Sequence, residues 1–127
     1  MKSKLIIGIG ADIIEIERIK KAIEKSDRFL DRCFSEDERI LFDIRNRRSE
    51  VIAGNFAAKE AFSKAIGTGV REFELAEVSV LRDELGKPYI KLSGRACEIV
   101  NEMTVSRIHV SISHCREYAV ANVILES

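Results

Sequence analysis

Apolar residues recur along the chain with two different periods, which separate predicted helices from predicted strands. In the first half most of them return every three or four positions, as on one face of a helix, whereas two later stretches alternate apolar and polar residues. The pattern predicts a buried strand at 5–9, a helix carrying Ile16, Ile19 and Ile23, and a central helix that begins near Glu50 or Val51. It then predicts a hairpin at 78–92, a helix after Ser93, and a second hairpin at 108–125.

Capping and breaking residues set the boundaries between these elements. Ser26 and Asp27 interrupt the first helical pattern. Ser35 stands three residues before Glu38, the spacing of a capping box, and predicts that another helix begins there. Gly67 and Gly69 supply the stop beyond the last turn of the central helix.

The central stretch, GNFAAKEAFSKAIGTG at 54–69, combines a closely packing face with charged side chains. Its small apolar face is made of Ala57, Ala58, Ala61, Phe62 and Ala65. Glu60 and Lys64 lie one turn apart on a second face, where we also expect Lys59 and Ser63. A solvated Glu–Lys pair would account for this face, but so alanine-rich a helix could also bring Glu60 against a second carboxylate as a metal pair.

Asp12 is the best candidate for that second carboxylate. It follows the first predicted strand in the sequence GIGAD, which begins like a dinucleotide fingerprint but has Ile13 where the third glycine should stand, so we discard that motif. Asp12 could cap the first helix by accepting backbone N–H groups, or it could bind a metal. The residues alone leave both roles open.

Length, charge and cysteine content limit the classes of protein to which the chain can belong. The 127 residues, 46% of them hydrophobic, suit a single domain spanning 1–127. Lys and Arg number 21, as do Asp and Glu, so no overall charge favours nucleic acid or membrane binding. The three cysteines lack CxxC spacing, which argues against disulfides and zinc, and the first apolar run is too short for a signal peptide or membrane span. We therefore expect a cytoplasmic protein.

A local charge pattern does stand out before residue 33. Basic residues alternate at spacings of three and four opposite the apolar face of the first helix, and they are Arg18, Lys21, Lys25, Arg28 and Arg32. A partner surface and a solvated face are both compatible with this pattern.

Three separated motifs resemble one family. They are GIGADIIEIERI at 8–19, FAAKEAFSKAIGTG at 56–69 and HVSISHCREYAVA at 109–121, joined by the Gly86-Lys87-Pro88-Tyr89 turn. In this order they are similar to the holo-acyl-carrier-protein synthase group of the 4′-phosphopantetheinyl transferases. The resemblance implies an α/β fold of the α+β kind, with short helices packed on an antiparallel sheet, and a homotrimer whose active sites lie between subunits.

The same resemblance implies a reaction. The phosphopantetheine arm of coenzyme A is transferred to a serine of apo acyl-carrier protein, with Mg²⁺ as cofactor and release of adenosine 3′,5′-bisphosphate, in fatty acid biosynthesis. Position by position, Asp12 and Glu60 match the magnesium ligands and Lys64 the lysine beside the pyrophosphate, and these three form the implied catalytic set. Glu60 is the plausible proton acceptor.

Other matched positions concern coenzyme A and the carrier. His114 matches a histidine near the 3′-phosphate, and the turn made of Gly86, Lys87 and Pro88 lies near the adenine in the family. Asn55 stands where the family has an arginine, so one phosphate contact is in doubt. Because carrier proteins are acidic as a class, the resemblance makes four basic residues the docking surface, namely Arg18, Lys21, Lys25 and Arg28.

Three other classes of function are considered. A serine–histidine hydrolase could use His114 with nearby serines, but the chain has no GxSxG elbow, and His109 within its strand is better explained as a sheet residue. A magnesium-dependent phosphoesterase acting on a nucleotide-like substrate would replace the carrier serine with water. A carrier-binding module or trimeric scaffold without chemistry would not need Asp12 or Glu60.

Overall fold

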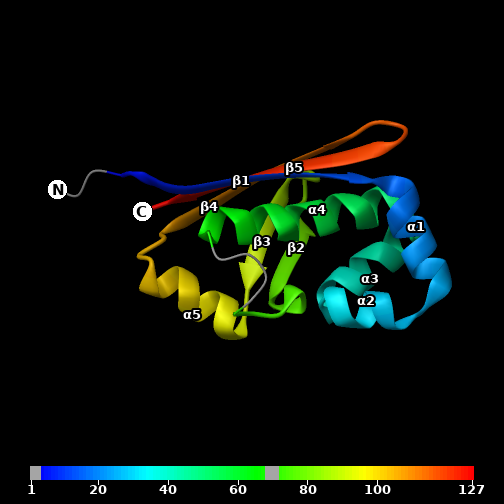
Figure 1. Cartoon of the computed structure of the whole chain (residues 1–127), viewed down its shortest axis with the longest axis horizontal. Helices are drawn as coiled ribbons and strands as arrows, with labels where there is room; N and C mark the ends of the chain where they lie inside the picture. The colour runs from blue at the N-terminus through cyan, green and yellow to red at the C-terminus, as the bar shows by residue number, and fades with distance from the viewer. Residues whose placement is uncertain (1–3, 68–71) are drawn as a thin grey trace.

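A three-stranded antiparallel sheet and one long helix form the centre of the molecule. The computed structural model describes residues 4–67 and 72–127, so Thr68 and Gly69 of the central motif lie outside the described residues. The sheet has the order β1-β5-β4, from Ile6–Glu15, Tyr118–Glu126 and Arg107–His114. Helix α4, Ser49–Ile66, lies along one face of this sheet (Figure 1).

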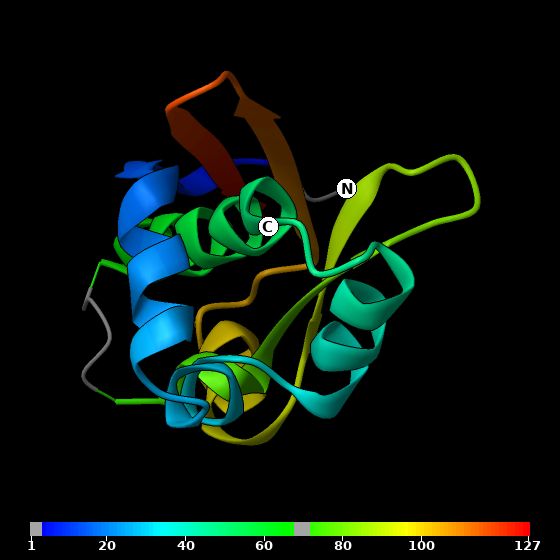
Figure 2. The ribbon, with the colours of Figure 1, turned by 90° about the vertical axis from the view of Figure 1, so that its right-hand side faces the viewer.

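The other elements surround α4 on the side away from the sheet. Three helices connect β1 to α4, and they are α1 (Ile16–Lys25), α2 (Arg28–Cys33) and α3 (Glu36–Ile44). After α4 come the 3₁₀ turn η1 (Leu75–Glu77), the hairpin of β2 (Val78–Arg82) and β3 (Pro88–Leu92), and α5 (Gly94–Glu102). Figure 2 shows α1 and the β2–β3 turn on opposite sides of α4. The predicted mixture of short helices and antiparallel strands is confirmed.

Local sequence signals place most of these boundaries correctly. The Ser35 hydroxyl accepts from the Glu38 amide while the Glu38 carboxylate accepts from the Ser35 amide, so the predicted capping box is present. Helix α4 ends at Gly67, whose φ of 94° is the left-handed conformation expected at such a stop. Both hairpins form, and no helix in the described part of the chain is long and apolar enough to cross a membrane.

The core lies between α4 and the inner face of the sheet. Strand β5 contributes its alternate residues Ala119, Ala121, Val123 and Leu125, all buried. The alanine-rich face of α4 meets them, with Ala57, Ala58 and Ala61 fully buried. Small residues on both sides bring the helix close to the sheet.

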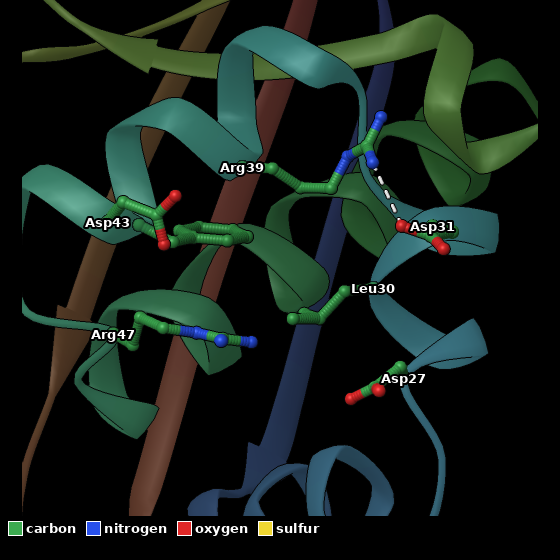
Figure 3. A pocket seen from close by; sticks show the side chains of 7 residues that line it. Asp27, Leu30, Asp31, Arg39, Asp43 and Arg47 are labelled. Atoms are coloured by element: carbon green, nitrogen blue, oxygen red, sulfur yellow. Dashed lines mark hydrogen bonds and ion pairs between the residues drawn. The ribbon is translucent and has the colours of Figure 1, made fainter.

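A hollow lies between α2 and α3, away from the sheet (Figure 3). Its charged lining residues are Asp27, Asp31, Arg39, Asp43 and Arg47, and Arg39 forms an ion pair with Asp31 at 2.8 Å. Three carboxylates and two guanidinium groups therefore largely offset one another there, and the hollow presents no strong charge to a ligand.

The glycines of β1 allow a separate test of the close packing. A Cβ on Gly10 would overlap the carbonyl oxygen of Ala61 and come within 2.7 Å of the Ala65 nitrogen, whereas a Cβ on Gly67 would meet nothing within 4 Å. Gly10→Ala should therefore lower the free energy of unfolding by about 3 kcal/mol through overpacking. Gly67→Ala should lower it by about 1 kcal/mol through backbone strain alone.

Urea unfolding of both variants at one protein concentration measures the difference. Equal losses for the two substitutions would show that β1 can move away from α4 at little cost.

Candidate active site

The structure brings Asp12, Glu60 and Lys64 together between β1 and α4. Asp12 pairs with Ala121 of β5, whose side chain is buried, and directly opposed residues point to the same face, so the carboxylate faces α4. The Lys64 ammonium donates to Asp12 Oδ1 and to the carbonyl oxygen of Ala11, both at 3.1 Å. The side chain of Asp12 is only 18% exposed, whereas that of Lys64 is 56% exposed.

Glu60 completes this cluster from one turn earlier on α4. Its pKa is raised, first by burial and then by the negative charge of Asp12, while Lys64 acts in the opposite direction. The two carboxylates therefore lie close enough to repel each other, and a single ammonium offsets them. Such an arrangement favours an added positive charge between the carboxylates.

Of the two roles left open for Asp12, capping of the first helix is excluded. Strand β1 continues through Asp12 to Glu15, and α1 begins only at Ile16. The strand is longer than the predicted 5–9 because Gly8 and Gly10 form no turn. They pack against the backbone of α4, where a side chain would collide. Asp12 is thus held rigidly, as a strand residue paired on its β5 side.

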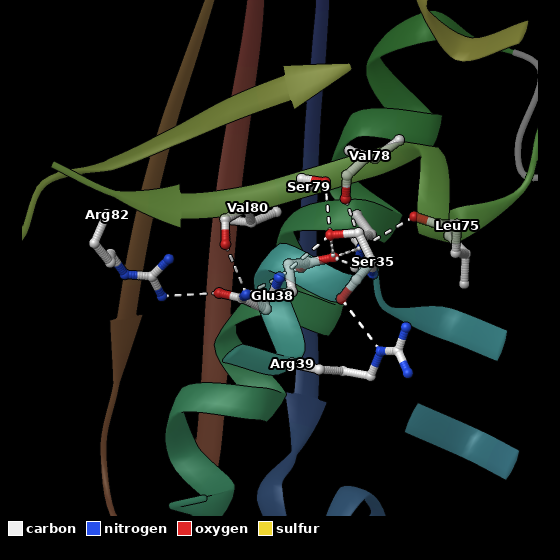
Figure 4. Close-up of polar contacts among 10 residues, drawn as sticks. Ser35, Glu38, Arg39, Leu75, Val78, Ser79, Val80 and Arg82 are labelled. Atoms are coloured by element: carbon white, nitrogen blue, oxygen red, sulfur yellow. Dashed lines mark hydrogen bonds and ion pairs between the residues drawn. The ribbon is translucent and has the colours of Figure 1, made fainter. Parts of the chain in front are cut away.

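The prediction that Lys59 and Ser63 share the face of Glu60 and Lys64 is wrong. Lys59 is fully buried and Ser63 almost so. The Lys59 ammonium donates to Glu38 Oε1 at 2.5 Å and to the carbonyl oxygens of Leu75 and Val78. Figure 4 shows this network of polar contacts, which joins α3, α4 and β2.

The spacing of the polar residues in α4 is a sequence signal for this network. Asn55, Lys59 and Ser63 follow one another at four-residue spacing, so they form a polar line along the same side of the helix. A polar line on a helix that is otherwise apolar indicates an internal partner, and that partner is Glu38, which also serves the capping box.

His114 lies apart from the carboxylates. It ends β4 and pairs with Ala119, which in turn pairs with Ile14 of β1, so two strand spacings, about 10 Å, separate it from β1. The side chain is exposed and lines a hollow with Glu50 and Arg116 at the start of α4.

The Gly86-Lys87-Pro88 turn lies beyond the β4 edge of the sheet. Asp83 Oδ1 accepts from the amides of Leu85 and Lys87, both at 2.9 Å, and Gly86 has a φ of 85°. These contacts hold the shape of the turn, which shares a hollow with His109 and Val110 of β4. In one chain, therefore, β1, which carries Asp12, and this turn lie toward opposite edges of the sheet.

The predicted docking residues form an exposed surface. Arg18, Lys21 and Lys25 project from α1 opposite the buried Ile19, and Arg28 opens α2. The predicted break at Ser26 and Asp27 is present between the two helices.

Charge substitutions should move the pKa of Glu60 in opposite directions. Asp12→Asn removes a negative neighbour and should lower this pKa, whereas Lys64→Ala removes a positive one and should raise it. An NMR titration of the Glu60 carboxyl measures both shifts. Shifts of the same sign would contradict the arrangement of the cluster.

The pH dependence of folding stability should also reflect the raised pKa of Glu60. Because the folded-state pKa of Glu60 is raised, the unfolded chain releases this proton first, and stability falls as pH rises from the ordinary glutamate pKa through the raised one. Asp12→Asn should make that fall smaller.

Known proteins resemble the chain over nearly its whole length. A model of the 4′-phosphopantetheinyl transferase superfamily matches residues 8–123. A holo-acyl-carrier-protein synthase from Clostridium perfringens is 51% identical over 126 residues, covering 96% of this chain and 95% of that protein.

Solved structures agree with this relationship. The synthase from Neisseria meningitidis superposes with a TM-score of 0.90 at 32% identity, covering 97% of this chain and 100% of that one. The synthase from Bacillus anthracis, in complex with coenzyme A (3′,5′-ADP), superposes with a TM-score of 0.80 at 42% identity, covering 96% and 97%. The chain belongs to the 4′-phosphopantetheinyl transferase superfamily.

Proposed function

We propose that this protein transfers the 4′-phosphopantetheine group of coenzyme A to a serine of apo acyl-carrier protein. The products are holo acyl-carrier protein and adenosine 3′,5′-bisphosphate. Its relatives bear the name of this activity, and those from Bacillus anthracis and Helicobacter pylori were solved in complex with coenzyme A. Within the chain, the observation that carries the proposal is the meeting of Asp12, Glu60 and Lys64.

The chemistry of the donor set fits Mg²⁺. Mg²⁺ prefers oxygen ligands, keeps several waters and uses one or two carboxylates with substrate phosphates. Asp12 and Glu60 supply two such carboxylates, and no group of three or more His, Cys, Asp or Glu within residues 4–67 and 72–127 could hold a metal by itself. The remaining ligands would therefore come from water and from the diphosphate of coenzyme A.

Each residue of the cluster has a different role in the transfer. Lys64 faces the diphosphate and offsets negative charge as the serine oxygen bonds to the phosphorus and the bond to the bisphosphate leaving group breaks. Glu60 accepts the serine proton, a role for which its raised pKa suits it. Asp12 keeps Lys64 in place through their ion pair. Mg²⁺ bound by Asp12 and Glu60 would add Lewis-acid stabilisation of the diphosphate oxygens.

Weighing the carrier protein by mass spectrometry after incubation with coenzyme A and magnesium tests the activity. Holo carrier should accumulate with the wild-type protein. A phosphoesterase would instead consume coenzyme A without modifying the carrier, and a binding module would leave both substrates unchanged. Glu60→Gln and Asp12→Asn keep the shape of the site but remove its negative charge, so each should reduce turnover at limiting magnesium by about 100-fold or more.

We also propose a closed homotrimer with active sites between subunits. The outer face of the sheet supports assembly, because Ile9 and Ile13 are 70% and 64% exposed and pair with Ile124 and Val120 of β5. Exposed apolar residues at these two levels, on either side of the exposed Asn122, favour association. The threefold symmetry is what the family resemblance implies.

Shared sites would also explain the separation of functional groups in one chain. The carboxylates lie at the β1 edge and the Gly86-Lys87-Pro88 turn beyond the β4 edge. In a ring of copies the turn of one subunit can approach the carboxylates of the next, so that coenzyme A bridges them.

Light scattering at micromolar concentration should give the mass of a trimer. Mixed refolding tests the sharing of sites, because Asp12→Asn and Gly86→Val subunits are each expected to be inactive alone. Together they should recover up to about a quarter of wild-type activity by random assembly. A fully active monomer, or no recovery from correctly assembled mixtures, would contradict the shared site.

The carrier is proposed to dock on Arg18, Lys21, Lys25 and Arg28. All four are exposed, and α1 directly follows the strand that holds Asp12, so a carrier bound there places its serine near the cluster. Since the formal net charge of the chain is zero, only a local surface can attract an acidic partner. The three free thiols agree with the proposal that the reaction takes place in the reducing cytoplasm.

Charge reversal on α1 should weaken carrier binding selectively. Arg18→Glu with Lys25→Glu should raise KM for apo carrier by about tenfold, about 1.4 kcal/mol, and leave KM for coenzyme A nearly unchanged. Added salt should reduce the difference. Lys91→Glu with Arg107→Glu makes the same charge change at exposed positions elsewhere and serves as the control. Equal carrier KM values for the two double variants at low salt would place the docking surface elsewhere.

A further inference from the structure

Asn55 is turned inward and both ends of its amide are occupied. The side chain is fully buried, with Nδ2 donating to Glu38 Oε2 at 3.0 Å and to the Val80 carbonyl at 2.9 Å. Its Oδ1 accepts a hydrogen bond from Nη2 of Arg82 at 2.8 Å. Asn55 therefore makes no contact with a ligand at the surface, but it fixes the guanidinium of a residue that does reach the surface.

Arg82 carries a positive charge that the fold does not neutralise. It is half-buried at the end of β2, and its other contact is Nη1 donating to the Leu81 carbonyl at 3.3 Å. Glu38 is the nearest carboxylate in the network, but it already pairs with Lys59. Among the described residues no carboxylate lies within 4.0 Å of Arg82.

A second guanidinium adds to this charge. Arg45, the C-cap residue that follows α3, is close enough for its charge to lower the pKa of Arg82, although burial of Arg82 is the larger cause. Arg45 likewise has no carboxylate within 4.0 Å among the residues described. Arginines stay protonated at working pH, so two like charges held near each other favour an anion.

The position of this pair indicates which anion. Arg82 pairs directly with Pro88, so the guanidinium emerges beside the turn proposed to hold the adenine of coenzyme A. The diphosphate belongs at the carboxylate cluster, which lies on the other side of the fold. The phosphate closest to the adenine is then the one on the ribose 3′ oxygen.

We propose that Arg82, oriented by Asn55 and assisted by Arg45, binds the 3′-phosphate of coenzyme A. In this chain the cation would thus project from β2 instead of from position 55 of α4, where the resemblance places an arginine. The inference rests on the proposed function for its choice of ligand, and Asn55 acts in it as a positioning residue. Guanidinium groups suit this task because they bind phosphate oxygens through paired, charge-assisted hydrogen bonds.

Comparison of coenzyme A with 3′-dephospho-coenzyme A tests the proposal. Arg82→Gln should raise KM for coenzyme A about tenfold and change KM for the dephospho form less than twofold. Arg45→Gln should act in the same direction with smaller size, and Arg82→Lys should restore part of the loss. Arg107→Gln, the same chemical change at an exposed residue of β4, should alter neither KM.

Calorimetry keeps this test independent of the transfer reaction. The dissociation constant of adenosine 3′,5′-bisphosphate should rise about tenfold in Arg82→Gln, whereas that of adenosine 5′-monophosphate should not change. If the wild-type protein modified no carrier, the proposed function would fail while these binding measurements still decided the role of Arg82.

A double-mutant cycle assigns the role of Asn55. Asn55→Ala should raise KM for coenzyme A in the parent protein. It should add little in the Arg82→Gln variant, since both substitutions weaken the same contact between Arg82 and the phosphate. Thermal unfolding of each variant checks that the fold is intact. Equal effects on both forms of coenzyme A, or a loss of stability with unchanged KM, would show that Arg82 only braces β2 against α4.

Discussion

The close contact between β1 and α4 is the constraint on which the candidate site depends. Gly8 and Gly10 leave no side chain between the strand and the backbone of the helix at Ala61 and Ala65. Two residues further along the strand, Asp12 is then within reach of Lys64 and of the charge of Glu60. A larger residue in either glycine position would push β1 away from α4. The carboxylates of Asp12 and Glu60 would then separate, although neither residue had been substituted.

The other side of α4 depends on the buried pair of Glu38 and Lys59. Burial alone raises the pKa of Glu38 and lowers that of Lys59, and each charge opposes the shift of the other. Removing one member would leave an uncompensated buried charge, which typically costs about 3–5 kcal/mol. Because Glu38 also binds Asn55 and caps α3, this single pair fixes α3, α4 and β2 relative to one another.

Local signals in the sequence predicted the elements well, and contacts between distant segments explain the errors. The capping box at Ser35, the stop at Gly67 and both hairpins depend on neighbouring residues, so the sequence was sufficient for them. The length of β1 and the burial of Lys59 depend on partners far along the chain. Periodicity could pair Glu60 with Lys64, but it could not tell which polar residues face the core. The family resemblance had already paired Asp12 with Glu60, and the approach of β1 to α4 is the contact that brings Asp12 to Lys64.

The distribution of charge connects these features with the proposed function. A chain with equal numbers of acidic and basic residues cannot attract an acidic carrier or a phosphorylated cofactor by its overall field. It must instead hold charges locally, and the fold does so in three places. The carboxylates repel each other beside one ammonium, and the basic face of α1 lies opposite Ile19. Arg82 forms no ion pair with Glu38, which already pairs with Lys59. In each place the backbone or a buried partner keeps like charges close, so binding of an opposite charge can release the repulsion.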